Sequence, residues 1–187
     1  GENSLLEIGD HTIVREYCTL NRGTKASMTT KIGAHCLLMA YVHVAHDCFV
    51  GNHVILANNV NLAGHIDIGD HAILGGLTAV HQFVKIGAHV MVGGGSLVTK
   101  DIPPFAKAAR EPLIYEGVNA IGLRRRGFQK EQIDRIHEIY RYLFIKYRNI
   151  TKAVNMIREE LPESEEKTVI LEFIQGSNRG IMKGHRR

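Results

Sequence analysis

An aliphatic side chain recurs at every sixth position through much of the first half of the chain. The series has twelve consecutive members between Ile32 and Val98. An α-helix buries residues three and four positions apart, whereas short strands joined by corners give a period of six. The sequence therefore predicts a parallel β-helix with these residues in its core: Ile32, Leu38, Val44, Val50, Leu56, Leu62, Ile68, Leu74, Val80, Ile86, Val92 and Val98.

A longer period of eighteen residues sets the cross-section of this β-helix. Four tetrapeptides of the form aliphatic–Gly–X–His begin at Ile32, Val50, Ile68 and Ile86. Three hexads therefore form one coil, and the prism is triangular. We expect each glycine to supply an unusual φ at a corner. The histidines of this series are interpreted as structural polar side chains on the outside of the turn: His11, His35, His53, His71 and His89.

One hexad of additional chain interrupts the register near the start. The tetrapeptide Ile8–His11 matches the series but lies twenty-four residues before Ile32, which is one coil plus six residues. The polar stretch 22–30 is the natural place for the chain to leave the coil as a loop. A loop on a rigid scaffold often contacts substrate. A solvated loop without function is the alternative.

Composition limits the core, the compartment and the partners. Hydrophobic residues make up 44% of the chain but aromatic residues only 6%, so the core is mainly aliphatic. The formal charge is +4 without a basic stretch interleaved with aromatic residues, so no nucleic-acid partner is expected. No apolar run reaches the ~20 residues of a membrane span. Three cysteines without disulfide spacing fit a reducing compartment such as the cytoplasm, and all fall at inward positions: Cys18, Cys36 and Cys48.

The repeat ends at Pro103–Pro104, because proline stops a strand ladder. We predict a β-helix over residues 1–104 and an α-helical domain over residues 105–187. Since the repeat is already running within the first residues, the β-helix is interpreted as incomplete at its N-terminal end.

Apolar residues at helical spacing predict three helices in the second domain. The first covers residues 129–147. The second begins after Thr151 as N-cap and ends near Leu161, before a proline. The third covers residues 164–175, with Gly176 as its C-cap.

The stretch from Val42 to Cys48 has the composition of a reactive centre. It places His43, His46 and Asp47 within five residues. Side chains eighteen residues apart stack in one column, and adjacent coils are ~4.8 Å apart. The repeat therefore brings one group of polar residues and a glycine to one corner across three coils: His43, His46, Asp47, Asn61, Gly64, His65, His81 and Gln82.

This group suits acyl transfer to a hydroxyl. A neutral imidazole at His46 is a general base for an alcohol, and Asp47 can fix its tautomer. Gly64 lies one coil above His46 and offers a backbone N–H for an oxyanion. No serine or cysteine accompanies them as a nucleophile, so direct attack by a substrate hydroxyl is favoured. Two other classes remain open, a zinc hydratase using the clustered histidines and a non-catalytic β-helix used for assembly.

Six segments resemble the UDP-N-acetylglucosamine O-acyltransferase family of the hexapeptide-repeat acyltransferases: residues 42–48, 56–59, 62–65, 75–83, 87–94 and 122–128. The resemblance implies a left-handed β-helix and a homotrimer in the bacterial cytoplasm. It implies transfer of an (R)-3-hydroxyacyl group from the phosphopantetheine of acyl carrier protein to the 3-hydroxyl of UDP-N-acetylglucosamine, the first step of lipid A biosynthesis. No bound cofactor and no metal are expected. A related N-acyltransferase or O-acetyltransferase of the same fold is the second possibility.

The resemblance also assigns roles to single residues. His46 is the general base, Asp47 its partner and Gly64 the oxyanion donor. The cleft is expected to be lined by His43, His65, Gly76, His81, Gln82 and Met91, and the nucleotide diphosphate to be held by Asn119, Arg125 and Arg126.

Acyl-chain length and partner binding complete these expectations. Gly94 stands where the family measures acyl length and, lacking a side chain, should admit a longer chain than Met would. Basic side chains after residue 123 form either a solvated face or a dock for the acidic carrier protein. The chain departs from the family pattern at two positions, with Ile121 where an acidic residue is common and Pro112 where a polar one sometimes occurs.

Overall fold

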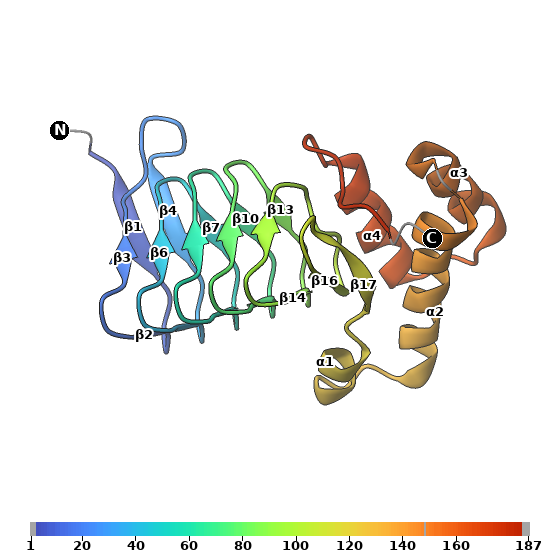
Figure 1. Ribbon diagram of the computed structural model, residues 1–187, viewed down its shortest axis with the longest axis horizontal. Coiled ribbons are helices and arrows are strands. Elements are labelled where there is room, and N and C mark those ends of the chain that lie inside the picture. Colours follow the sequence, from blue (N-terminus) through green and yellow to red (C-terminus); the bar gives the residue numbers. More distant parts are fainter. Residues whose placement is uncertain (1–2, 148, 185–187) are drawn as a thin grey trace.

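Three parallel sheets form the sides of a triangular prism, and a helical part lies beyond one end of it (Figure 1). The computed structural model describes residues 3–147 and 149–184. One sheet contains β1 (Leu5–Ile8), β4 (Thr29–Ile32), β7 (Phe49–Val50), β10 (Asp67–Ile68) and β13 (Lys85–Ile86). The second contains β2 (Ile13–Val14), β5 (Leu37–Leu38), β8 (Ile55–Leu56), β11 (Ile73–Leu74), β14 (Met91–Val92), β16 (Ala106–Ala109) and β17 (Ile114–Val118). The third contains β3 (Thr19–Leu20), β6 (His43–Val44), β9 (Asn61–Leu62), β12 (Ala79–Val80) and β15 (Leu97–Val98).

The register of these strands confirms both sequence periods. Equivalent residues pair eighteen apart, as Lys31 does with Phe49, while β1 and β4 pair twenty-four apart, Leu5 with Thr29. All twelve residues of the six-residue series are at most 4% exposed. The prism is therefore held together by one continuous aliphatic column and by backbone hydrogen bonds between coils.

The corner glycines do not have the unusual φ predicted for them. The positive φ falls two residues later, on the histidine: His35, for example, has φ 56°. The glycine is required for space instead, because a Cβ at Gly33 would lie 2.5 Å from the carbonyl oxygen of Gly51 in the next coil. A histidine tolerates the left-handed region better than most side chains do.

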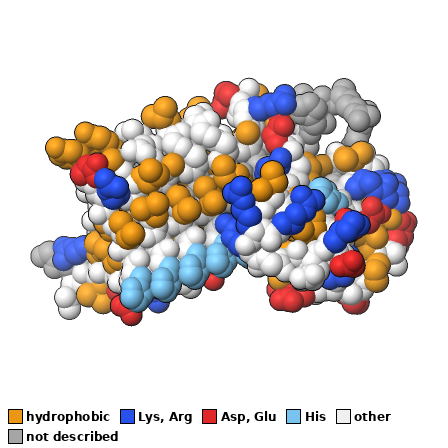
Figure 2. All heavy atoms as spheres, turned by 90° about the horizontal axis from the view of Figure 1, so that it is seen from below, with side chains coloured by type: hydrophobic (Ala, Val, Ile, Leu, Met, Phe, Trp, Pro, Cys, Tyr) orange, Lys and Arg blue, Asp and Glu red, His pale blue; other side chains and the backbone are white. Residues whose placement is uncertain are grey.

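The corner histidines form one stacked column along an edge of the prism. From His11 to His89, neighbouring rings have centroids 4.7–4.9 Å apart and are nearly parallel. Figure 2 shows them as a continuous pale-blue stripe. The column continues onto Phe105. These rings cover one another along the edge, as the structural interpretation of the histidines predicts.

The last histidine of the column makes folding sensitive to acid. Burial, followed by the charges of His71 and Arg126, lowers the pKa of His89 to about 4. Because the unfolded value is near 6.5, this group's contribution to stability is complete above pH 6.5 and is lost as the pH falls towards 4. Because the ring is only partly buried and solvent screens part of the effect, the loss between pH 7.5 and pH 5 is at most about 2 kcal/mol.

We therefore expect His89→Phe to reduce the drop in unfolding free energy between pH 7.5 and pH 5 by up to that amount. Phenylalanine keeps an aromatic ring in the stack but does not titrate. Urea unfolding at fixed protein concentration measures the drop, and His35→Phe serves as the control because it leaves His89 in place. An unchanged drop in His89→Phe would contradict the assignment.

The stretch 105–118, predicted as part of a helical domain, is still β-structure. β16 pairs in parallel with β14 and so extends the second sheet by one coil. β17 then pairs antiparallel with β16. The prolines stop the hexad series without stopping the sheet, because Pro104 lies at a corner and the ladder resumes at Ala106.

The helical part begins at α1 (Ala120–Arg125) and contains the three predicted helices with shifted ends. The first is α2 (Lys130–Arg141), followed by a π-helical turn, η1 (Tyr142–Lys146). α3 (Ile150–Glu160) begins earlier than predicted because Asn149, and not Thr151, accepts the N-cap hydrogen bond from Lys152.

α4 (Glu165–Gln175) has the predicted C-cap, Gly176, and Ser164, predicted as its first residue, is its N-cap. The helical part is anchored to the prism by Asp101, a buried carboxylate that accepts from the backbone N–H of Lys85 and from the hydroxyl of Ser177. In the described part of the chain, no helix combines the length and the apolar character needed to cross a membrane.

Candidate active site

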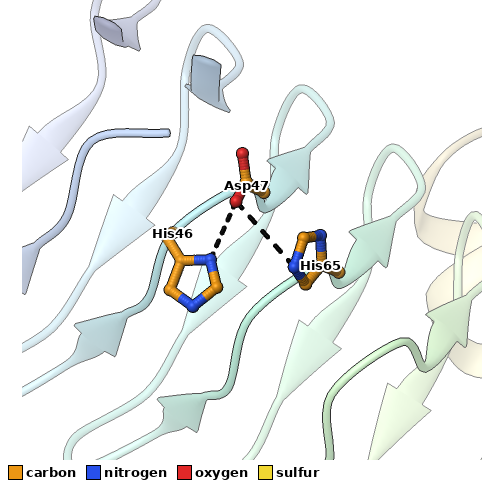
Figure 3. Close-up of side chains that lie close together, drawn as sticks. All are labelled: His46, Asp47 and His65. Atoms are coloured by element: carbon orange, nitrogen blue, oxygen red, sulfur yellow. Dashed lines mark hydrogen bonds and ion pairs between the residues drawn. The ribbon is translucent and has the colours of Figure 1, made fainter. Parts of the chain in front are cut away.

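The predicted reactive centre lies at the corner between β6 and β7. His46 and Asp47 occupy this corner, and His65 occupies the same corner one coil later, between β9 and β10. Figure 3 shows both imidazoles turned towards the Asp47 carboxylate. Nδ1 of His46 lies 2.8 Å from Oδ2 of Asp47, and Nε2 of His65 lies 3.9 Å from the same oxygen. The eighteen-residue period thus brings these side chains together as predicted.

Asp47 is completely buried and accepts an unusual number of hydrogen bonds. Its Oδ1 accepts from the N–H groups of Thr24 and Ser27 and from the Ser27 hydroxyl. Its Oδ2 accepts from the Thr24 hydroxyl and from His46. Burial alone would raise the pKa of this carboxyl, but the bonds from Ser27, Thr24 and His46 outweigh burial and hold the pKa far below its usual range. Asp47 is therefore ionised throughout the physiological range.

Thr24 and Ser27 were missed in the sequence because the loop that carries them was interpreted only by its polarity. They belong to the additional hexad between β3 and β4, which Figure 1 shows as a blue loop rising beside β4. A signal was present: because Thr29 stacks eighteen residues before Asp47, the residues just before Thr29 must lie at the Asp47 corner. The loop contacts Asp47 on the side away from His46.

His46 combines an oriented ring with an accessible outer nitrogen. Its side chain is 42% exposed, whereas Asp47 is buried beneath it. Since the ionised Asp47 can only accept, Nδ1 of His46 is the donor, and in the neutral ring Nε2 then keeps its lone pair. This tautomer is the one that a general base needs.

Gly64 lies directly against the His46 ring. A Cβ at position 64 would be 2.6 Å from Cε1 and 2.9 Å from Nε2 of His46, so only glycine leaves room for the ring. The N–H of Gly64 has no acceptor among the described residues. An N–H left free beside the base is suited to an oxyanion.

The other polar residues of this corner form its outer part. His65 packs edge-on against His46 and stacks on Phe83. His43 lies on β6, and its Nδ1 is 2.7 Å from the hydroxyl of Thr19 on the neighbouring strand β3. On its other side His43 pairs in register with Asn61 of β9. His81 and Gln82 are exposed one coil further on, and the His81 ring contacts the Gln82 carbonyl oxygen.

Three further predicted residues lie elsewhere on the same chain. Gly76 and Gly94 are neighbours at the corner that joins the second and third sheets, where a Cβ at Gly94 would be 3.0 Å from the Gly76 carbonyl oxygen. Met91 lies on the outer face of the second sheet, half-buried. None of them belongs to the corner of His46.

The predicted nucleotide residues gather at α1, beside the histidine column. Asn119 caps this helix and donates to the carbonyl oxygen of His89. Arg126 donates to the carbonyl oxygen of His71, and its Nη1 is buried without a partner among the described residues. Arg125 is exposed. Ile121 is 63% exposed and brings no charge to this surface.

The cysteines take no part in the site. Cys36 and Cys48 are buried in the core, and Cys18 is half-buried in the same interior. Burial raises the pKa of Cys48 to about 11. Although Cys48 follows Asp47 in sequence, its thiol points inward and donates to the carbonyl oxygen of Ala63, as the hexad position predicted.

Two family models match the chain. Residues 101–182 match the second domain of UDP-N-acetylglucosamine O-acyltransferase. Residues 29–64 match the bacterial transferase hexapeptide repeat.

Curated relatives match nearly the whole chain. The acyl-[acyl-carrier-protein]–UDP-N-acetylglucosamine O-acyltransferase of Sulfurihydrogenibium sp. is 58% identical over 97% of this chain and 67% of its own length. The protein of the same name from Aquifex aeolicus is 57% identical over 100% of this chain and 72% of its own length.

Solved structures of these enzymes share the fold. The UDP-N-acetylglucosamine acyltransferase of Bacteroides fragilis superimposes with a TM-score of 0.95 at 46% identity, covering 98% of this chain and 72% of that one. LpxA from Acinetobacter baumannii gives 0.92 at 43% identity, with the same coverage. A left-handed parallel β-helix followed by helices is therefore the fold. The chain belongs to the UDP-N-acetylglucosamine O-acyltransferase family.

Proposed function

We propose that this protein transfers an (R)-3-hydroxyacyl group from acyl carrier protein to the 3-hydroxyl of UDP-N-acetylglucosamine, with His46 as general base. The relatives carry the two substrates in their names. In the proposed reaction, Nε2 of His46 takes the proton of the sugar hydroxyl as its oxygen attacks the thioester carbonyl. The N–H of Gly64 stabilises the oxyanion, and as the C–S bond breaks the protonated imidazole gives the proton to the departing thiolate.

One observation carries this proposal above the others. A buried, ionised carboxylate holds Nδ1 of an exposed histidine at 2.8 Å, and the residue against that ring in the next coil is a glycine whose N–H has no acceptor among the described residues. A β-helix used only for assembly has no need for this arrangement. A substrate hydroxyl is the nucleophile in the proposal, because Cys48 is buried and its thiol faces the core.

The separated positions of the predicted residues support a homotrimer. The residues proposed for catalysis lie at the His46 corner, those proposed for acyl contact lie on the second sheet and its next corner, and those proposed for the nucleotide lie at α1. One complete site in this proposal therefore requires residues from more than one chain. The outer face of the second sheet offers a suitable apolar surface, formed by half-buried side chains: Leu37, Ile55, Ile73 and Met91. The next corner adds the exposed Tyr41 and Leu77.

The acyl donor in this proposal arrives on the phosphopantetheine of acyl carrier protein in the bacterial cytoplasm, and no bound cofactor is used. The three free cysteines suit a reducing compartment. Not every basic side chain of the helical part is available for docking, because Arg141 pairs with Glu138 and Lys146 with Glu160. The exposed Arg124 and Arg125 on α1 are better placed for phosphate groups.

The same corner contains the one candidate metal-binding group in the described residues: His46, Asp47 and His65, whose ligand atoms lie within 4.8 Å of one another. The hydrogen bonds of Asp47 argue against this use. Both of its oxygens already accept, from five donors in all. A metal ion would have to displace His46 or the loop to gain a carboxylate ligand.

The function is tested by incubating the protein with hydroxyacyl carrier protein and UDP-N-acetylglucosamine, with and without EDTA. We expect an O-acylated nucleotide sugar, identified by mass spectrometry, at the same rate in both. An amine-bearing sugar nucleotide in place of the hydroxyl acceptor tests the N-acyltransferase alternative. Loss of turnover with EDTA and its return with zinc would contradict the metal-free mechanism. A preference for the amine-bearing sugar would contradict the proposal that the acceptor group is a hydroxyl.

A further inference from the structure

The loop between β3 and β4 directs its donors at a single carboxylate. Four of its groups reach Asp47: the Thr24 N–H at 2.9 Å, the Thr24 hydroxyl at 2.6 Å, the Ser27 N–H at 3.3 Å and the Ser27 hydroxyl at 2.5 Å. The Ser27 oxygen is also 2.9 Å from the carbonyl oxygen of Thr29. Because the shorter of the two contacts is to a charged oxygen, the Ser27 hydroxyl donates its hydrogen bond to Asp47 and not to Thr29.

The loop is itself held in a fixed shape. The N–H of Met28 donates to the carbonyl oxygen of Thr24, and the N–H of Gly23 donates to the carbonyl oxygen of Leu5 on β1. On the other side, the hydroxyl of Thr30 accepts from the N–H of Asp47. The loop and His46 thus fix the Asp47 carboxylate, while β4 fixes the Asp47 backbone.

We propose that Thr24 and Ser27 are positioning residues for the catalytic base: they fix the Asp47 carboxylate at the angle that directs His46 Nε2 towards the acceptor hydroxyl. The inference rests on the proposed general-base role of His46. The sequence suggested either a loop that contacts substrate or a solvated loop without function. The proposed role differs from both, because the loop holds the carboxylate that orients the base and does not contact substrate. Without the two hydroxyls, Oδ1 keeps only the backbone N–H groups of the loop and Oδ2 keeps only His46. The Asp47 carboxylate and the His46 ring can then turn together.

This role is tested by measuring kcat and KM for three variants: Thr24→Val, Ser27→Ala and the double variant that combines them. Complete loss of an orienting carboxylate costs up to about 10⁴ in kcat in a serine triad, so loosening it is expected to cost ~10-fold per hydroxyl and ~100-fold in the double variant. KM for the nucleotide sugar and for the acyl carrier protein should stay within about twofold, because neither residue contacts them in this account. Thr24→Ser keeps the hydroxyl and should restore at least half of the wild-type kcat.

Thr12→Val is the matched control. Its hydroxyl also bridges two coils, donating to Gly33 and accepting from Cys36, but at the histidine corner. Loss of a bridging hydroxyl alone should therefore lower stability without lowering kcat. In a His46→Ala background, adding Thr24→Val and Ser27→Ala together should lower kcat by less than about twofold, because the base that the two hydroxyls position is already absent.

The outcomes separate this inference from the proposed function. If His46→Ala is inactive but the double variant turns over like Thr12→Val, the positioning role is wrong and the general base stands. A loss confined to KM, or a Thr24→Ser variant as slow as Thr24→Val, also overturns the positioning role. If His46→Ala keeps wild-type kcat, the general base and the positioning role fall together.

Discussion

Replacing His46 by alanine is expected to lower kcat about 10³-fold while leaving the fold intact. The side chain is 42% exposed and contributes nothing to the aliphatic core, so its removal affects chemistry rather than stability. General bases typically contribute 10²–10⁴, and a 10³-fold loss corresponds to about 4 kcal/mol of transition-state stabilisation. The KM for the nucleotide sugar should change little, because the interaction forms mainly in the transition state.

The control for this variant is His137→Ala, which removes an exposed histidine from α2. It should keep the wild-type rate. A His46→Ala variant that retains more than a tenth of the wild-type kcat would contradict the role of His46 as general base.

Gly64→Ala should be nearly as damaging, through a steric mechanism. The added Cβ would lie 2.6 Å from Cε1 of His46, so the ring must leave its place beside Asp47. The backbone itself accepts alanine, because Gly64 does not have a positive φ. We expect kcat to fall by a factor of 10²–10³, within the range expected for loss of a general base, with the thermal transition almost unchanged.

A double-mutant cycle identifies the mechanism of this loss. The N–H at position 64 survives the substitution, so Gly64→Ala harms the enzyme only by moving His46. In a His46→Ala background the same change should then cost less than about threefold. An equal loss in both backgrounds would mean that the methyl group blocks substrate instead. Gly176→Ala at the end of α4, where the nearest atom to a new Cβ is 3.5 Å away, is the tolerated control.

The scaffold was predictable because its two periods leave few alternatives. Twelve aliphatic residues at six-residue spacing have no other way to be buried, and the eighteen-residue period places His46 beneath Gly64 and Asp47 beneath His65. The corner glycines were harder to interpret. Periodicity locates them but does not distinguish a positive φ from a close approach between coils, and at Gly33 the close approach is the cause.

The loop and the C-terminal part were less accessible from sequence because they do not repeat. Thr24 and Ser27 resemble any polar loop residues until their contacts with Asp47 are seen. The strands β16 and β17 have no hexad pattern, although β16 completes the coil begun by β14. Helix ends depended on single caps, and Asn149 was a better cap than Thr151. Gly94 and Arg125, which the family resemblance predicted as site residues, lie away from the His46 corner, at another corner of the prism and on α1.

The most direct test of the account is the protonation state of the His46 ring at about pH 8. Labelling the histidine ring nitrogens with ¹⁵N, and identifying the signal by its loss in His46→Ala, gives the tautomer independently of activity. The structure predicts a proton on Nδ1, donated to Asp47, and a bare Nε2. Asp47→Asn should remove this preference. A wild-type ring that carries its proton on Nε2 would contradict the proposed base, because no lone pair would then face the substrate.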